Sequence, residues 1–202
     1  MEEASLPAST LVYNSVIEAF TRGHQQDEAH LWFSKMEQAG LQPTEVSFTH
    51  MANACAQRGN AVQAMEWLAQ MEGTRLQCSM IAYDGVIHAL GKLGLLEDCQ
   101  DVVARMATLR LAAGVRTYNS LISAAAKADQ PDAAEEWLEA MLAKSVMPNT
   151  ISYTAAINAC RWINPLAKRS HKAEQLVTRM LRSGTRADKP LCKLLVATLG
   201  RE

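Results

Sequence analysis

The sequence predicts an all-α protein, an α-solenoid of stacked helix–turn–helix repeats, and three observations lead to this prediction. Aromatic residues recur every 35 residues, at Tyr13, Phe48, Tyr83, Tyr118 and Tyr153. Alanines recur with the same period, at Ala19, Ala54, Ala89, Ala124 and Ala159. Aromatic residues make up only 5% of the 202 residues, and 10 Gly and 6 Pro are too few for a many-stranded β fold. A period shared by two independent columns indicates internal repeats.

Each period carries two apolar stripes with the spacing of an amphipathic helix. The first stripe follows the i, i+3, i+4, i+7 pattern and comprises Tyr13, Val16, Ile17 and Phe20. The second stripe follows a polar break and comprises Ala29, Trp32, Phe33 and Met36. A turn containing Pro43 or Pro148 closes the first and fourth periods. Because one helical hairpin cannot bury both stripes, we expect the hairpins to stack, with a core that includes Trp32, Trp67 and Trp137.

The columns set the boundaries of the repeats. Five repeats run over residues 10–44, 45–79, 80–114, 115–149 and 150–188, after a lead-in at 1–9 and before a partial sixth repeat or capping helix at 189–202. The methionine column Met36, Met71, Met106 and Met141 continues four residues late, at Met180. This delay places a four-residue insertion between Cys160 and Ala173. Residues 161–172 are basic and contain the turn signal Asn164-Pro165, so we expect a solvated loop there.

Charge and cysteine usage narrow the class of protein. The formal net charge is −1, with 5 basic and 12 acidic residues in 1–100 and 15 basic and 9 acidic residues in 101–202. A basic C-terminal half of this kind can orient an anionic partner. The cysteines Cys55, Cys78, Cys99, Cys160 and Cys192 form no C-x-x-C pair. We therefore expect reduced, buried thiols rather than disulfides or a metal site.

The sequence contains no catalytic motif that we can identify. It has no P-loop, no G-x-S-x-G, no H-E-x-x-H and no deaminase signature. We therefore expect no catalytic residue, no metal and no small-molecule cofactor, and we do not expect an enzyme. No apolar run approaches the roughly 20 residues of a membrane span, so no membrane partner is expected. Residues 1–5 are acidic where an organellar transit peptide would be Arg-rich, so no transit peptide is visible in this chain.

Three segments at the starts of repeats carry a resemblance to a known family. They are VYNSVI at 12–17, RTYNSLI at 116–122 and ISYTAAI at 151–157, and the repeat endings at 40–44 and 146–149 fit as well. Over about residues 10–200 the chain resembles the pentatricopeptide repeat (PPR) family, which implies a right-handed superhelix. The second and third repeats depart from the pattern, because Cys78 and Ala113 replace the closing proline and Arg75 and Met80 are unusual.

The resemblance implies that the protein binds single-stranded RNA, about one base per repeat, read by two side chains of each repeat. One reader follows the aromatic residue of the first helix and the other closes the repeat. Position by position, the pairs are Asn14 with Thr44, Thr49 with Ser79, Asp84 with Gly114, Asn119 with Asn149, and Thr154 with Asp188. The family pattern then implies a pyrimidine, an adenine-like purine, an unassigned base, a pyrimidine and a guanine. The alternative is that these side chains are only exposed polar residues of helices.

Two further columns fit RNA binding. The family's base-flanking positions are Leu11, Val46, Ile81, Arg116 and Ile151, four of which are aliphatic and suited to clamping the face of a base. The thirteenth residues of the repeats include Arg22, Lys92, Lys127 and, in the partial repeat, Arg201, which are suited to RNA phosphates. The alternative, of equal weight, is that these are ordinary cations at exposed helix ends, where Lys and Arg interact favourably with the helix dipole. The basic insertion could likewise contact the RNA backbone or a partner.

Two functions therefore remain open at the level of sequence. The first is a single-stranded RNA adaptor for organellar RNA processing, editing, stability or translation, located by resemblance in the mitochondrion or chloroplast. Protein partners would supply any catalysis. The second is an α-solenoid scaffold for protein–protein interaction without RNA binding. The reader pairs and the basic column favour the first.

Overall fold

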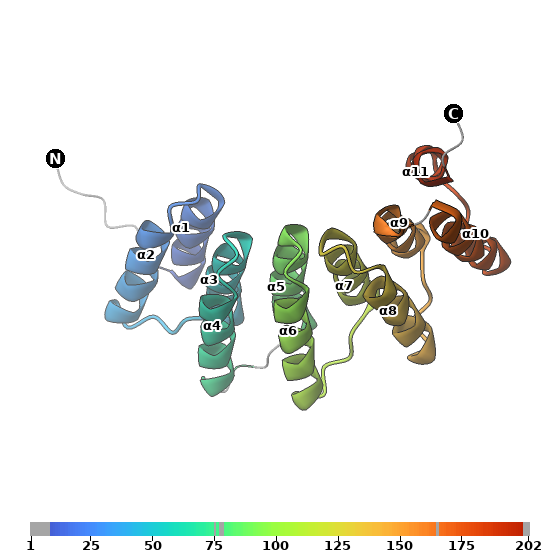
Figure 1. Ribbon diagram of the computed structural model, residues 1–202. Helices are drawn as coiled ribbons and strands as arrows, with labels where there is room; N and C mark the ends of the chain where they lie inside the picture. Colours follow the sequence, from blue (N-terminus) through green and yellow to red (C-terminus); the bar gives the residue numbers. More distant parts are fainter. Residues whose placement is uncertain (1–8, 75, 77–78, 165, 200–202) are drawn as a thin grey trace. The chain divides into compact units, whose positions relative to one another are not determined.

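The computed structural model describes residues 9–74, 76, 79–164 and 166–199, and the regular elements in these residues are all helical (Figure 1). The chain divides into two compact units, Met1–Ala89 and Leu90–Glu202. The boundary lies inside the first helix of the third repeat. Each unit is described separately below.

The N-terminal unit contains the first two helical hairpins. The helices are α1 (Thr10–Arg22), α2 (Gln26–Gln38), α3 (Glu45–Gln57), α4 (Ala61–Gly73) and the first part of α5 (Met80–Leu93). Helix α1 packs against α2 and also against α3, so neighbouring hairpins stack. The stacking buries aromatic side chains: Trp67 lies 4.8 Å from Phe33 and 6.1 Å from Phe48 between ring centroids. The predicted core position is confirmed for Trp67, whereas Trp32 and Trp137 are only half-buried.

The C-terminal unit continues the same pattern. After the end of α5 its helices are α6 (Leu96–Thr108), α7 (Val115–Lys127), α8 (Pro131–Ala143), α9 (Thr150–Ala159), the short 3₁₀ helix η1 (Cys160–Trp162), α10 (Leu166–Arg182) and α11 (Lys189–Leu199). Helix α7 packs against both α8 and α9, and α9 packs against α10 and α11. The methionine column is buried throughout the chain, with Met36, Met71, Met106, Met141 and Met180 at most 1% exposed. The all-α architecture of stacked hairpins is therefore confirmed.

The turns repeat as regularly as the helices. A residue with positive φ follows the first helix of repeats 1 to 4, at His24, Gly59, Gly94 and Asp129. Another follows the second helix of repeats 1, 3, 4 and 5, at Gly40, Arg110, Ser145 and Gly184. In each case the next backbone N–H reaches back to close the helix, as Leu41 N does to the Met36 carbonyl at 3.1 Å. A left-handed residue with this bond ends a helix sharply, which allows the chain to reverse direction.

The insertion in repeat 5 is where the structure differs from the prediction. We expected a solvated loop over 161–172, but α10 begins at Leu166 and is 17 residues long, whereas α8 is 13. The four additional residues therefore form an extra turn at the start of the helix, after the short helix η1. Leu, Ala, Lys and Arg, which dominate residues 166–169, are good helix formers, and a turn signal such as Asn-Pro also occurs before helix starts.

Candidate nucleic-acid interface

In repeat 1 the structure brings the predicted reader pair into contact. Asn14 lies in the second turn of α1 and Thr44 is the N-cap of α3. The Asn14 amide Nδ2 donates to Thr44 Oγ1 at 3.3 Å. A third residue joins them: Ser47 Oγ donates to Asn14 Oδ1 at 2.6 Å and accepts from the Thr44 backbone N–H at 3.0 Å. The serine belongs to the next repeat, so the cluster spans two hairpins.

Repeat 4, in the other unit, contains the same arrangement. Asn119 Nδ2 donates to Asn149 Oδ1 at 3.4 Å. Ser152 Oγ donates to Asn119 Oδ1 at 2.5 Å and accepts from the Asn149 backbone N–H at 3.1 Å. The Asn149 side chain also accepts from the Ser152 backbone N–H at 3.1 Å, which caps α9. The predicted pairs of repeats 1 and 4 are thus in direct contact, and in each a serine of the next repeat contacts both members.

The threonine readers of repeats 2 and 5 are arranged differently. Thr49 Oγ1 donates to the Glu45 carbonyl and Thr154 Oγ1 to the Thr150 carbonyl, both at 2.7 Å. Their predicted partners are engaged elsewhere: Ser79 donates to the Glu45 carboxylate, and Asp188 accepts from the Leu191 backbone N–H at 2.9 Å as the cap of α11. Within the described part of the chain, these pairs therefore show no direct hydrogen bond.

The reader of repeat 3 is the least accessible of the set. Asp84 in α5 is only 3% exposed. Its predicted partner Gly114 has no side chain and serves as the N-cap residue of α7, where its backbone N–H donates to Thr117 Oγ1 at 3.1 Å. This repeat therefore offers fewer side-chain groups to a ligand than its neighbours do.

The predicted base-flanking column is exposed. Four aliphatic members lie on the surface at the starts of first helices, with exposed fractions of 75% for Leu11, 51% for Val46, 68% for Ile81 and 63% for Ile151. Arg116 is also exposed. Single exposed aliphatic residues are ordinary, but recurrence in one slot of successive repeats is not explained by core packing. The column can supply apolar contact to a flat ligand in each repeat.

The predicted phosphate-binding column lies at the C-terminal ends of first helices. Arg22, Lys92 and Lys127 are all exposed, whereas Arg201 lies outside the described residues. The Arg22 guanidinium pairs with Glu18 at 2.6 Å, and Lys127 Nζ donates to the Lys92 carbonyl at 2.5 Å. Of these three side chains, Arg22 is partly neutralised by its own helix, so its attraction for phosphate is weaker.

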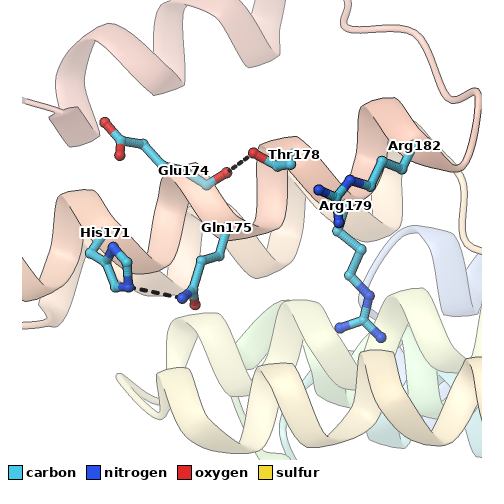
Figure 2. Close-up of a pocket in the computed structure, with 6 residues that line it drawn as sticks. All are labelled: His171, Glu174, Gln175, Thr178, Arg179 and Arg182. Carbon is cyan, nitrogen blue, oxygen red and sulfur yellow. Dashed lines mark hydrogen bonds between the residues drawn. The ribbon is translucent and has the colours of Figure 1, made fainter.

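A surface hollow along α10 contains further basic side chains but is not part of the predicted interface (Figure 2). Its lining residues are His171, Glu174, Gln175, Thr178, Arg179 and Arg182. Arg179 pairs with Glu139 of α8, and Lys172 pairs with Asp132 at 2.7 Å and Glu135 at 2.8 Å. The bond from Lys172 lowers the pKa of Asp132, and the bond from Arg179 lowers that of Glu139. These cations therefore hold neighbouring second helices together.

The cysteines behave as small core residues. Burial raises the pKa of Cys55 to about 11, of Cys99 to about 12 and of Cys160 to about 11, so these thiols stay protonated at neutral pH. Cys192 is exposed, and Cys78 lies outside the described residues. Over the described ranges, no group of His, Cys, Asp or Glu is arranged to hold a metal ion. In the same ranges no helix combines the length and apolarity that crossing a membrane requires.

The residues that sequence reasoning missed are Ser47 and Ser152. Both are fully buried, and each contacts both members of a reader pair. They lie 33 residues after the asparagine that they contact. A periodic comparison of hydroxyl residues at the starts of first helices could have found them.

Family profiles match most of the chain. The PPR repeat family matches residues 8–57 and 113–161, the pentatricopeptide repeat domain matches 33–93, and the single PPR repeat matches 81–111. A comparison with curated protein sequences finds no significant match.

Solved PPR structures share the fold. The crystal structure of PPR10 from maize superposes with a TM-score of 0.79 at 21% identity, over 96% of this chain and 27% of that one. PPR10 in complex with an 18-nucleotide psaJ RNA element gives 0.75 at 19% identity, over 96% and 26%. The PPR domain of Arabidopsis thaliana protein-only RNase P 1, in complex with tRNA, gives 0.69 at 13% identity, over 93% and 97%. The chain thus spans about a quarter of the PPR10 chain.

The matched segments run from residue 8 to residue 161 with a single residue between them, and all of them are PPR repeats. The helical hairpins and the recurring turns agree with this assignment. The chain is therefore a member of the pentatricopeptide repeat family.

Proposed function

We propose that this protein is a single-stranded RNA adaptor that recognises about one base per repeat. The observation that carries the proposal is the contact between the two predicted readers in repeats 1 and 4, through Asn14 with Thr44 and Asn119 with Asn149. Two side chains that meet at one point can address the edge of a single base. The exposed aliphatic column supports the proposal, because an apolar side chain in each repeat can contact a base face. The RNA complexes of PPR10 and of the RNase P domain support it as relatives.

The hydrogen-bonding states of the readers suggest which bases they prefer. In repeats 1 and 4 the asparagine oxygen already accepts from a serine, so the amide Nδ2 offers a proton to a base acceptor. Uracil and cytosine present such acceptors on their Watson–Crick edges, as do adenine N1 and guanine O6, so the choice of a pyrimidine comes from the family pattern. In repeats 2 and 5 the threonine proton is already donated to the helix, so the hydroxyl offers only lone pairs. Those suit the amino group of adenine and the ring N–H and amino group of guanine, but also the donors of cytosine and uracil, so the choice of a purine comes from the family pattern.

In this proposal the protein covers about five nucleotides and blocks nucleases or unwanted base pairing at that site. Any chemistry on the RNA would come from protein partners. The family resemblance suggests action on mitochondrial or chloroplast transcripts, in processing, editing, stability or translation. Five bases do not specify a unique transcript, so partners or further repeats would add specificity.

Fluorescence anisotropy tests the proposal directly. The chain is titrated into a labelled pool of random single-stranded RNA at three salt concentrations, with double-stranded RNA as the control. We expect saturable binding that prefers single strands and weakens as salt rises. Equal affinity for both forms, or no binding at low salt, would contradict the proposal and favour the protein–protein scaffold.

A further inference from the structure

The third residue of the next repeat divides the repeats into two classes; it lies 33 positions after the reader in repeats 1 to 4, and 37 positions after it in repeat 5 because of the four-residue insertion. Asn14, Asp84 and Asn119 are followed at this distance by a hydroxyl residue: Ser47, Thr117 and Ser152. Thr49 and Thr154 are followed by an apolar residue, Ala82 and Leu191. A reader with an amide or carboxylate is thus always matched by a hydroxyl on the next repeat, and a threonine reader never is. We propose that Ser47 and Ser152 are positioning residues that set the orientation of the asparagine amide toward the RNA base.

The geometry of both clusters identifies the direction of the hydrogen bonds. Each serine oxygen accepts a backbone N–H, from Thr44 at 3.0 Å or from Asn149 at 3.1 Å. Its own proton is then free to be donated. Ser47 Oγ donates to Asn14 Oδ1 at 2.6 Å and Ser152 Oγ donates to Asn119 Oδ1 at 2.5 Å, and these are the shortest hydrogen bonds that either serine hydroxyl makes. The carbonyl side of each amide is therefore held on the serine.

The held amide leaves a defined group for the ligand. One proton of Asn14 Nδ2 is directed to Thr44 and one proton of Asn119 Nδ2 to Asn149. The second proton of each amide has no hydrogen-bond partner among the described residues and is available to a base acceptor. Without the serine, the amide could rotate by half a turn and present its oxygen instead, which would accept an amino group. The serine thus determines whether the asparagine presents its N–H donor or its oxygen acceptor to the base.

A purely structural role for the hydroxyl can be separated from this one. Each serine also closes the first turn of its own helix through the bond from the N-cap backbone, and Thr117 does the same for Gly114 at 3.1 Å. The Thr117→Ala variant therefore removes an equivalent cap without changing Asn14 or Asn119. Conversely, Ser152→Thr keeps the hydroxyl, and threonine already occupies the equivalent position of repeat 4 as Thr117.

The test is RNA selection from a random single-stranded pool, followed by sequencing of the bound fraction. The full chain is compared with the variants Ser47→Ala, Ser152→Ala, Ser152→Thr and Thr117→Ala, and thermal unfolding is measured for each. We expect Ser152→Ala to reduce the preference at one position of the selected motif from about tenfold to about twofold. Ser47→Ala should do the same at a second position, three nucleotides away. Ser152→Thr should restore the preference, and Thr117→Ala should leave both positions unchanged.

The inference rests on the proposed function, and its failure can be distinguished from failure of that function. Unchanged base preferences in both alanine variants, with selective binding by the original chain, would overturn the positioning role alone. So would an equal loss of preference at those two positions in Thr117→Ala, because the effect would then follow helix capping. Absence of any selected sequence for the original chain would overturn both the adaptor and the positioning role.

Discussion

Repeats 1 and 4 share one way of presenting a reader, and repeats 2 and 5 share another. In the first class a buried serine of the next hairpin holds an asparagine amide. In the second class a threonine hydroxyl is bonded to its own helix, and the residue in the serine's slot is Ala82 or Leu191. The buried methionine column continues through repeats of both classes, at Met36, Met71, Met141 and Met180. In the proposed RNA adaptor, this difference predicts that base preference depends on a residue pair from adjacent repeats rather than on the reader alone.

The largest effect should come from replacing core residues that both classes of repeat have in common. Ile122 and Ile157 are fully buried at equivalent places in α7 and α9, three residues after Asn119 and Thr154. Replacing either with alanine should lower the free energy of unfolding by about 3 kcal/mol, because each change leaves a cavity in the core. Urea denaturation measures both. A loss in one variant less than half that in the other would show that the two classes differ in their packing as well as in their readers.

The next effect tests whether the classes can be exchanged. The double variant Asn119→Thr with Ser152→Ala reproduces in repeat 4 the residue pair of repeat 2. The threonine proton should then bond to the Val115 carbonyl of its own helix, as Thr49 bonds to Glu45, which leaves an acceptor in place of a donor. We expect the preferred base at that position to change from a pyrimidine to a purine, with a shift of about tenfold in relative affinity. Competition anisotropy with RNAs that differ at one base measures it.

Repeat 1 supplies the internal control for that exchange, because Asn14 and Ser47 are unchanged in the double variant. The preference at the position read by repeat 1 should stay as it is. A simultaneous change at both positions would mean that the variant alters RNA binding as a whole, and the division into two classes would fail.

A smaller effect concerns the basic column, which does not depend on the class of reader. Lys92→Gln should weaken RNA binding about twofold to threefold, and it should reduce the slope of log affinity against log salt by about 0.7. Arg22→Gln should change both quantities less, because Glu18 already pairs with Arg22 at 2.6 Å. Anisotropy titrations at several salt concentrations measure the slopes. Neither variant should change which bases are preferred. A changed base preference would show that these cations do more than bind phosphate.

The smallest effect concerns the ion pairs between second helices. Asp132 is 87% exposed, so Asp132→Asn should cost only about 0.3 kcal/mol of unfolding free energy at neutral pH. The pKa of Asp132 is lowered in the folded protein by its bond to Lys172, so the contribution is present at neutral pH and is lost as pH falls through the lowered folded pKa. Unfolding curves of the two proteins should therefore converge at acidic pH. A difference that grows on acidification would assign the effect to another group.

The sequence predicted the parts of this molecule that repeat locally. The columns through Tyr118 and Met141 identify helices, turns and boundaries because each repeat packs only on its neighbours, so the period of the chain is the period of the fold. The contacts of Asn14 and Asn119 with their paired readers also follow from the slots, although their roles in RNA binding stay predictions. The serines escaped notice because a cap at a helix start is the ordinary explanation for Ser47 and Ser152. Their second contact depends on the neighbouring hairpin.

The extra turn of α10 illustrates a second limit of prediction from the sequence. A local signal at Asn164-Pro165 predicts a break in the chain but does not say whether a loop or a new helix follows. Helix α10 starts at Leu166 and carries Lys172 to Asp132 and Glu135 of α8. Those tertiary contacts, together with residues of good helical propensity, favour continuing the helix over a solvated loop.

If the protein is the RNA adaptor proposed above, the order of the two reader classes along the chain has a consequence for how a bound strand can slip. Asn14 and Asn119, Thr49 and Thr154, and Ser47 and Ser152 are each three repeats apart. A strand displaced by one or two nucleotides would place bases chosen by an asparagine opposite other readers, so that hydrogen-bonding groups would no longer match. A displacement of three would again place asparagine-selected bases opposite asparagine and threonine-selected bases opposite threonine, over the repeats that still overlap. Transcripts with a triplet period should therefore occupy two alternative registers on this array. On such a transcript the protein would bind at a family of positions spaced by three nucleotides, rather than at one fixed site.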